Sequence, residues 1–489
     1  MIVKKCATRI IIENVEKDSQ LYKALVRALS VWDQVYHKYV MPIYYYDEDK
    51  KIFYVPGGYA LDKLKNLFYE SSIPFELIDV SEETRLKPRA MHKVNMTFPP
   101  RDDLQKAAIR FLSNKTEYAK NANQKLLSLK TGEGKTYCAI NYCVSNRVVP
   151  MIFVDQEKLG NQWIEAIKQF TDCTDDNIYY ISGQSSITSL LSKKKKDIKE
   201  YKFFVAIHRT VSNYMEKNFY QMNKLMEHLG IGVKIFDEAH VEIMSMFNID
   251  EATDVNSIYL TATPSRSNPK ENGMYKTAIR EIKIFSTDKG IFKKEPYLNI
   301  LLAMTNSNPK TNDTVKFNNK YGFNLNGYSA FMEKDKNYEF FISKITRLVD
   351  FANKSATRKI AIILHTLNMV SKVYDSLTNQ YPNLIINRFD STVKTDREEI
   401  LNNSNIIITT DMTFNKGIDI KGLEVVINLV PVGSATKNEQ MIGRLRELPG
   451  KEVWFFDVID VGVPEMPGIL NKKKGVYTKR AKRIKTITF

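Results

Sequence analysis

Short apolar segments alternate with helical patterns along most of the chain, from about residue 123 onward. The first five such segments are QKLLSL, VVPMIFVD, FFVAIH, VKIFDEAH and SIYLTAT. In the segment KLGNQWIEAIKQF, one helical face collects Leu159, Trp163, Ile164, Ile167 and Phe170. Apolar strands that alternate with amphipathic helices predict a parallel sheet with helices on both faces.

The alternation weakens over residues 265–340, where NSNPKTNDTVKFNNKYGFNLNG is rich in Asn, Lys and Gly and indicates a linker or insertion. It resumes with RKIAIIL, NLIINRF, SNIIITT, LEVVINLVP and KEVWFFDVID. These segments predict a second parallel sheet. We therefore expect an α/β fold with two tandem parallel-sheet lobes.

Residues 1–95 have a different character. The stretch YVMPIYYYDEDKKIFYVPGGYALDKL alternates aromatic and polar residues around an acidic, lysine-rich turn. This pattern predicts a β-hairpin followed by a helix, within a small α+β domain. Its Tyr and Lys side chains could bind nucleic acid, or they could form an ordinary solvated surface.

The net charge of +16 and the pI near 9.3 favour a polyanionic partner. The four cysteines are too few for a disulfide framework and lack zinc-ligand spacing, so we expect reduced thiols. The N-terminus has no signal-peptide pattern, and no run of about 18 apolar residues occurs. We expect a cytoplasmic protein with no membrane partner.

The segment LKTGEGKT, residues 129–136, connects an expected strand to an expected helix. Its glycines allow several backbone N–H groups to point at one anion, and the helix N-terminus adds partial positive charge. Lys135 can reach the β- and γ-phosphates of ATP, and Thr136 can bind Mg²⁺. Leu129 stands where the usual eight-residue motif has Gly. The expected ATP-binding residues of this loop are Thr131, Gly132, Glu133, Gly134, Lys135 and Thr136.

A second motif, FDEAH, follows the apolar segment VKIF. Asp237, at the end of an expected strand, is placed to bind Mg²⁺. Glu238 is placed to orient or deprotonate a water that attacks the γ-phosphate. The alternative is an acidic turn without a catalytic role.

GEGKT, DEAH and LTATP together resemble the superfamily-2 helicases of the DEAH type, over about residues 95–460. The resemblance implies RecA-like folds for both lobes and an adenine-binding Gln105 with Arg101 nearby. It implies that Gln162, Trp163 and, in AIHRTV, His208 contact nucleic acid.

The expected second lobe also carries motifs of this family. ITTDMTFNKGIDI resembles a segment that touches nucleic acid through Thr410 and the nucleotide through Gly417 and Asp419. EQMIGRLRE resembles the Gln-x-x-Gly-Arg signature, which implies that Gln440 lies near the γ-phosphate and that Arg444 is an arginine finger. The family's second arginine position holds Glu447, with Arg446 one residue earlier.

Three further residues carry an expected coupling role. His240, Thr261 and Thr263 would connect the nucleotide site to the nucleic-acid grip, as the resemblance implies. The alternative is that His240 caps its own loop and that the threonines pack at a strand end.

We therefore expect four regions: a small basic DNA-binding domain, an ATP-binding first lobe, a second lobe with a linker or insertion near 305–340, and a basic tail. Their bounds are 1–95, 96–285, 286–465 and 466–489. The last 19 residues contain eight cations and no acid. They suit either a disordered solubilising end or a contact with the phosphate backbone, and we favour the second.

The order of these regions resembles the compact phage helicases of the UvsW type. The resemblance implies an ATP- and Mg²⁺-dependent DNA motor that unwinds or branch-migrates forked and junction DNA in phage recombination, repair or replication within the host cytoplasm. The sequence does not fix the oligomeric state, and a monomer is our working expectation. The alternatives are an RNA helicase and a degenerate helicase fold that only binds nucleic acid. The presence of Lys135, Asp237, Glu238 and Arg444 disfavours the last.

Overall fold

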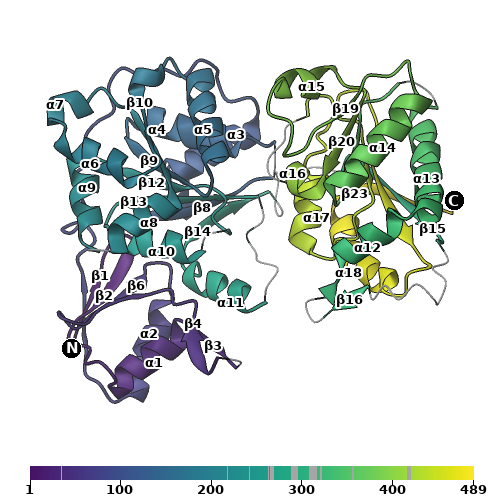
Figure 1. Ribbon diagram of the computed structural model, residues 1–489. Coiled ribbons are helices and arrows are strands. Elements are labelled where there is room, and N and C mark those ends of the chain that lie inside the picture. The colour runs from purple at the N-terminus through teal and green to yellow at the C-terminus, as the bar shows by residue number, and fades with distance from the viewer. Residues whose placement is uncertain are drawn as a thin grey trace. The chain divides into compact units, whose positions relative to one another are not determined.

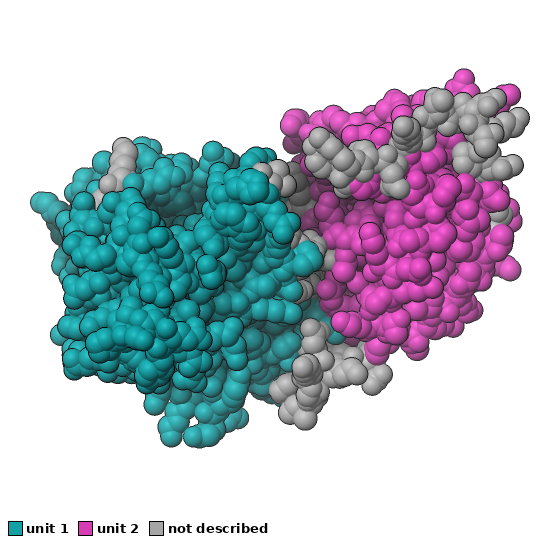
Figure 2. All heavy atoms as spheres, turned by 90° about the horizontal axis from the view of Figure 1, so that it is seen from below, with its two compact units in different colours: residues 1–293 teal, residues 294–489 magenta. Residues whose placement is uncertain are grey.

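The computed structural model describes residues 1–34, 36–130, 132–216, 219–241, 243–262, 264, 269–287, 296–307, 317–319, 322–354, 357–415 and 420–488. The chain forms two units, Met1–Lys293 and Lys294–Phe489 (Figure 2). The first unit holds both the N-terminal domain and the first lobe that the sequence predicts. Residues 286 and 287, which the sequence assigned to the second lobe, fall within the first unit.

The N-terminal domain is a mixed five-stranded sheet with two helices beside it (Figure 1). Its strand order is β5-β6-β2-β1-β7, with only β1 and β7 parallel. The predicted hairpin followed by a helix is present as β5, β6 and α2. A separate small hairpin, β3–β4, lies outside this sheet. The elements are β1 Ile2–Lys5, β2 Arg9–Ile12, α1 Gln20–Ala28, β3 Val31–Asp33, β4 Lys38–Val40, β5 Tyr45–Asp47, β6 Ile52–Pro56, α2 Leu61–Glu70 and β7 Glu76–Asp79.

The first lobe is built on a seven-stranded, wholly parallel sheet in the order β10-β11-β9-β12-β13-β8-β14. All five predicted strands are present, and their side chains are almost entirely buried, as in a sheet covered on both faces. The short edge strands β10 and β14 are additional. The strands are β8 Gln124–Ser128, β9 Pro150–Val154, β10 Ile178–Ile181, β11 Phe203–Ile207, β12 Val233–Phe236, β13 Asn256–Thr261 and β14 Lys283–Ser286.

Helices lie along both faces of this sheet (Figure 1). In the predicted helix α5, Trp163 and Ile167 are buried, which confirms the apolar face. At the start of α3, the Asp102 side chain accepts a hydrogen bond from the backbone N–H of Gln105 and so caps the helix. The helices are α3 Asp103–Leu112, η1 Glu117–Ala119, α4 Lys135–Ser145, α5 Glu157–Phe170, η2 Asp175–Asn177, α6 Gln184–Ser192, α7 Lys195–Ile198, α8 His208–Glu216, α9 Gln221–Leu229, α10 Ile243–Glu251 and α11 Pro269–Ala278.

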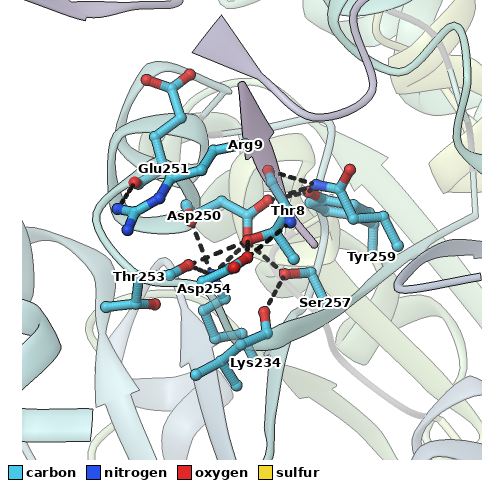
Figure 3. Close-up of polar contacts among 11 residues, drawn as sticks. Thr8, Arg9, Lys234, Asp250, Glu251, Thr253, Asp254, Ser257 and Tyr259 are labelled. Atoms are coloured by element: carbon cyan, nitrogen blue, oxygen red, sulfur yellow. Dashed lines mark hydrogen bonds and ion pairs between the residues drawn. The ribbon is translucent and has the colours of Figure 1, made fainter. Parts of the chain in front are cut away.

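A buried polar cluster joins the N-terminal domain to the first lobe (Figure 3). The backbone N–H of Thr8, just before β2, donates to a carboxylate oxygen of Asp254 at 3.0 Å, and Arg9 donates to the carbonyl of Glu251 at 2.7 Å. Lys234 lies 2.7 Å from the Asp250 carboxylate, and both side chains are almost inaccessible to water. Lys234 is near the amino end of β12, so the domain is attached at the sheet edge opposite the carboxyl ends of the strands.

The second unit contains another seven-stranded parallel sheet, in the order β19-β20-β18-β21-β22-β15-β23. The five predicted strands are present, and β15 and β23 are additional. The two lobes therefore confirm the predicted α/β class with tandem RecA-like sheets. The strands of this unit are β15 Leu298–Thr305, β16 Asn318–Asn319, β17 Gly322–Phe323, β18 Ile360–Leu364, β19 Ile386–Arg388, β20 Ile406–Thr410, β21 Val425–Asn428, β22 Val453–Asp460 and β23 Ala481–Thr488.

Helices of the second unit begin inside the segment that we expected to be a linker or insertion. Residues 325–332 form α12, and α13 starts at residue 335, so this part of the segment belongs to the folded lobe. Residues 308–316 and 320–321 of the segment lie outside the described residues. The helices are α12 Leu325–Met332, α13 Asp335–Asn353, α14 Leu367–Gln380, α15 Arg397–Asn403, α16 Asp411–Asn415, α17 Ala435–Ile442 and α18 Met466–Arg480.

The C-terminal segment, which we expected to be a separate basic tail, is part of the second lobe. Residues 466–480 form α18, and β23 pairs in parallel with β15. Lys473 is fully buried and donates to both carboxylate oxygens of Asp457 at 3.0 Å. A run of cations can thus form folded structure when one of them is paired in the core.

In the described part of the chain, no helix is both long enough and apolar enough to span a membrane.

Candidate functional site

The carboxyl edge of the first sheet brings the two predicted nucleotide motifs together. The glycine-containing loop follows β8, and Asp237 follows β12. One strand, β13, lies between β8 and β12, and it ends at Thr261. Because all these strands are parallel, their carboxyl ends meet at one edge, where open α/β sheets bind ligands.

Two glycines give the loop its shape. Gly132 has φ 86° and Gly134 has φ 91°, a left-handed conformation that other residues adopt only with strain. A Cβ on Gly134 would stand 2.3 Å from the amide nitrogen of Gln105, so the loop also needs glycine for close packing. Leu129, where the usual motif has Gly, is fully buried and extends the core beyond β8.

Lys135 and Thr136 open helix α4, directly after Gly134. The Lys135 ammonium donates to the carbonyl of Leu129 at 3.2 Å, so it lies across its own loop. A cation, a hydroxyl and the N-terminus of an eleven-residue helix converge here. This donor set suits a magnesium-bound triphosphate. Thr131 lies outside the described residues.

Glu133 points into the protein instead of toward a ligand. Its carboxylate is buried and accepts hydrogen bonds from the backbone N–H of Lys130 at 2.6 Å and from the Thr287 hydroxyl at 2.9 Å. The side chain therefore ties the loop to the residue that follows β14. Our prediction made Glu133 a nucleotide contact, but its carboxylate is occupied by these two protein donors.

Gln105 lies directly beside the loop. It is 4 % exposed, its amide nitrogen donates to the Glu133 carbonyl at 3.4 Å, and its amide oxygen accepts from the backbone of Arg101 at 2.8 Å. Arg101 is exposed and pairs with Asp102. The predicted adenine contacts thus lie at the loop, although both ends of the Gln105 amide already have protein partners.

The Asp237 carboxylate is held by two N–H donors. Its Oδ1 accepts from the backbone of Glu238 at 2.9 Å, and its Oδ2 accepts from the indole Nε1 of Trp163 at 2.8 Å. Burial and the neighbouring Glu238 charge raise the pKa of Asp237 to about 6, while the indole hydrogen bond and Lys135 oppose that shift. A carboxylate is an oxygen ligand of the kind that Mg²⁺ takes, so Asp237 is suited to bind a divalent cation together with the Thr136 hydroxyl.

Glu238 and His240 form the turn after Asp237. Glu238 has φ 46°, an uncommon conformation for a residue with a side chain. His240 Nδ1 lies 2.9 Å from the Thr261 hydroxyl and 3.4 Å from a Glu238 carboxylate oxygen. The turn is tied to β13 by the backbone bond from Ala239 to Leu260. Thr263, the third predicted coupling residue, lies outside the described residues.

The predicted nucleic-acid contacts of the first lobe divide into buried and exposed side chains. Gln162 is exposed on α5, but Trp163 and His208 are only 2 % and 4 % exposed. The His208 ring packs near Phe153 and Phe236, and burial lowers its pKa to about 4. The predicted side-chain contacts of Trp163 and His208 with nucleic acid are wrong for this structure, because both side chains lie in the core.

In the second unit, the predicted residues also lie at a carboxyl edge. Thr410 ends β20 and is nearly buried, and its hydroxyl caps α16 through Thr413. Gln440 is in α17. Arg444 follows that helix and donates to the carbonyl of Asn415 at 3.0 Å. Gly417 and Asp419 lie outside the described residues.

Sequence reasoning missed three contacts at these edges. They are the bond from Trp163 to Asp237, the bond from Thr287 to Glu133, and the 3.0 Å approach of His365 to the buried Asp411 carboxylate. Thr287 is 154 residues from Glu133, so no local pattern could reveal that pair. Trp163 was on the apolar helical face, and that pattern already indicated burial.

Two family models match the sequence. Residues 98–266 match "Type III restriction enzyme, res subunit", and residues 343–446 match "Helicase conserved C-terminal domain". No curated protein matches the sequence of the chain.

Solved structures share the fold at low sequence identity. The Type ISP restriction-modification enzyme LlaBIII bound to DNA is 13% identical, with a TM-score of 0.54, and the match covers 87% of this chain and 34% of that one. Mss116p bound to ssRNA and AMP-PNP is 15% identical, with a TM-score of 0.51, and the match covers 80% of this chain and 75% of that one. T4 UvsW is 15% identical, the match covers 100% of both chains, and the TM-score is 0.36. By its two family matches, the chain belongs to the superfamily-2 helicases, nucleic-acid-dependent ATPases that use ATP, typically with Mg²⁺.

Proposed function

We propose that this chain is an ATP-dependent DNA helicase or translocase that unwinds or branch-migrates forked and junction DNA. The observation that carries the proposal is the convergence of two motifs at one sheet edge. The loop with Lys135 and Thr136 follows β8, and Asp237 and Glu238 follow β12, with only β13 between these strands. ATP hydrolysis needs groups that bind the phosphates and Mg²⁺ and a group that orients the attacking water, and these two pairs of residues supply them.

Each of these four residues has a distinct role in the proposal. Lys135 binds the β- and γ-phosphates, while Thr136 and Asp237 hold Mg²⁺, which neutralises charge on the phosphates when bound. Glu238 orients the attacking water and accepts its proton. The left-handed backbone at Glu238 supports this, because strained conformations of non-glycine residues occur often at active sites.

Arg444 and Gln440 complete the proposed site from the second unit. In the transition state, negative charge spreads over the oxygens of the γ-phosphate. The roles proposed for the first lobe include no arginine that could stabilise this charge. We assign that role to Arg444, and we assign contact with the γ-phosphate to Gln440. A cation delivered from a separately folded unit makes hydrolysis depend on closure of the two units.

Closure also has to be passed on to the nucleic acid. The His240–Thr261 pair at 2.9 Å connects the turn after Asp237 to the end of β13, where LTATP begins. This contact supports a coupling role, and it gives the buried Thr261 hydroxyl a hydrogen-bond partner. Opening and closing of the two units while they hold a nucleic-acid backbone then moves the protein along the strand.

The substrate is assigned from charge and exposed aromatic groups. The net charge of +16 favours phosphate backbones, with binding that weakens steeply as salt rises. In the N-terminal hairpin β3–β4, Trp32, Tyr36 and Tyr39 are 45%, 71% and 37% exposed. Aromatic faces beside a cation such as Lys38 are suited to stacking on unpaired bases, which forks and junctions offer.

ATP hydrolysis measured with single-stranded DNA, forked DNA, a four-way junction and RNA tests this proposal. We expect DNA, and forked DNA above all, to stimulate the rate. Lys135→Ala should abolish stimulation and leave DNA binding largely intact. Stimulation by RNA alone would replace the proposal with an RNA helicase. Absence of hydrolysis with every polymer would leave a nucleic-acid-binding module.

A further inference from the structure

Trp163 is a buried tryptophan whose only polar atom is directed at the proposed Mg²⁺ ligand. The side chain is 2 % exposed on α5, a helix that packs against α4, β9 and β11. Its indole Nε1 donates to Oδ2 of Asp237 at 2.8 Å, a good geometry for a hydrogen bond between two buried groups. The two residues are 74 positions apart in the chain.

The Asp237 carboxylate is therefore fixed at both oxygens. Oδ1 accepts from the Glu238 backbone and Oδ2 accepts from Trp163, which sets the rotation of the carboxylate about its last bond. Each carboxylate oxygen has a second lone pair that neither donor uses. Indole N–H only donates, so Trp163 can orient the carboxylate without competing for a metal ion.

We propose that Trp163 is a positioning residue, which holds the Asp237 carboxylate in the orientation in which it binds the Mg²⁺ of Mg·ATP. The inference rests on the proposed ATP site. Groups that hydrogen-bond to a metal-binding side chain commonly contribute about 10–100-fold to metal affinity. The alternative role is core packing alone, which would need the ring of Trp163 but not its N–H.

Equilibrium binding of a fluorescent, non-hydrolysable ATP analogue distinguishes these roles without turnover. Binding is measured in EDTA and across a Mg²⁺ titration. For Trp163→Phe, which keeps an aromatic ring and removes the donor, we expect unchanged affinity in EDTA. We expect the Mg²⁺ concentration for half-maximal enhancement to rise about 10–100-fold. Ile167→Val, a fully buried apolar change on the same helical face, is the matched control and should leave both quantities unchanged.

Two results would overturn the inference. One is an unchanged Mg²⁺ requirement in Trp163→Phe. The other is an equal loss of affinity in EDTA and in Mg²⁺, which indicates damaged packing only. If Trp163→Phe does not fold, site-specific replacement of Trp163 by benzothienylalanine, in which sulfur replaces the N–H, gives the same two readouts. If the unaltered protein binds the analogue without any Mg²⁺ dependence, the proposed ATP site itself is wrong.

Discussion

Asp237 and Glu238 are adjacent carboxylates with different surroundings. Asp237 is held by Trp163 and by a backbone N–H, whereas Glu238 lies in a left-handed turn 3.4 Å from His240. A fixed carboxylate suits a metal ligand, because the metal site needs constant geometry. A side chain on a turn suits a group that must reach a water molecule and take up a proton.

Glu238→Gln should therefore bind ATP with near-normal affinity and hydrolyse it slowly. Loss of a general base costs about 10²–10⁴-fold in rate. Single-turnover hydrolysis with bound DNA measures the effect, and Glu157→Gln, an exposed change at the start of α5, is the control. A normal single-turnover rate would count against Glu238 as the residue that orients the water.

His208 gives a prediction about stability and pH. Burial lowers its pKa to about 4, while an unfolded histidine titrates near 6.5. The unfolded chain thus binds a proton that the folded chain refuses, so stability falls as pH decreases from about 6.5 toward 4. Between pH 7 and pH 5 this amounts to about 2 kcal/mol. Urea unfolding should show less loss for His208→Phe than for the unaltered protein; equal losses would refute the prediction.

Sequence motifs located the charged residues of the site but not the roles of the buried ones. Lys135 opens α4 after β8, and Asp237 and His240 lie in the turn after β12, where the alternation of strands and helices already placed them. For Trp163, the helical face indicated burial and the family motif indicated DNA contact, and the structure agrees with the face. Which buried donor meets Asp237 depends on packing between α5 and the sheet, and no local pattern contains it.

At the scale of elements, the sequence predicted most central strands of the two parallel sheets and missed the edge strands β10, β14 and β23. It predicted the edge strand β19 and missed β15, which lies between β22 and β23. Central strands such as β12 are buried on both faces and are therefore continuous apolar runs. The edge strand β23, with the sequence AKRIKTIT, is mostly exposed and rich in cations, which is also how a disordered tail looks. Its position depends on pairing with β15, which lies far away in the sequence.

The buried pair between Lys473 of α18 and Asp457 of β22 gives the first prediction for an element. Lys473→Met should destabilise the second unit by about 3–5 kcal/mol, because it leaves the Asp457 carboxylate buried without its cation. Lys472→Met, an exposed change one residue earlier, should change stability by no more than about 0.5 kcal/mol. Urea unfolding of both variants measures the difference. Similar small effects would mean that α18 is not anchored through this pair.

The hairpin β3–β4 gives the second prediction for an element. Seven aromatic side chains in the described part of the chain are more than a third exposed, and three of them lie here. Trp32 packs edge-on against Tyr39, its cross-strand partner, so this pair also stabilises the hairpin. The far more exposed Tyr36 lies in the turn, with the Lys38 ammonium 5.8 Å from its ring centre. Tyr36→Ala should weaken binding of single-stranded DNA by about 1–3 kcal/mol.

Tyr69→Ala, an equally exposed aromatic change on α2, is the control and should leave DNA affinity unchanged. Trp32 offers a direct signal, because the other two tryptophans, Trp163 and Trp454, are buried. Bases that stack on the hairpin should quench its fluorescence, and a polyanion without bases should not. Equal quenching by both polymers would show that charge alone brings them to the hairpin.

At the scale of the whole molecule, the described chain forms two compact units. The N-terminal domain and the first lobe form one unit, joined by contacts such as Thr8 to Asp254 across 246 residues. Composition suggested a boundary near residue 95 and could not reveal this attachment. The second unit, with Gln440 and Arg444, folds on its own core.

The central claim is the proposed ATP hydrolysis, and the role proposed for Arg444 tests it most directly. The measurement is single-turnover ATP hydrolysis at saturating forked DNA by the unaltered protein, Arg444→Ala and the control Arg446→Ala, an exposed change two residues later. The account predicts a loss of about 10³–10⁵-fold for Arg444→Ala, with ATP affinity changed little, and a small effect for Arg446→Ala. A normal rate for Arg444→Ala, or a loss of ATP affinity that accounts for its whole effect, would contradict the claim.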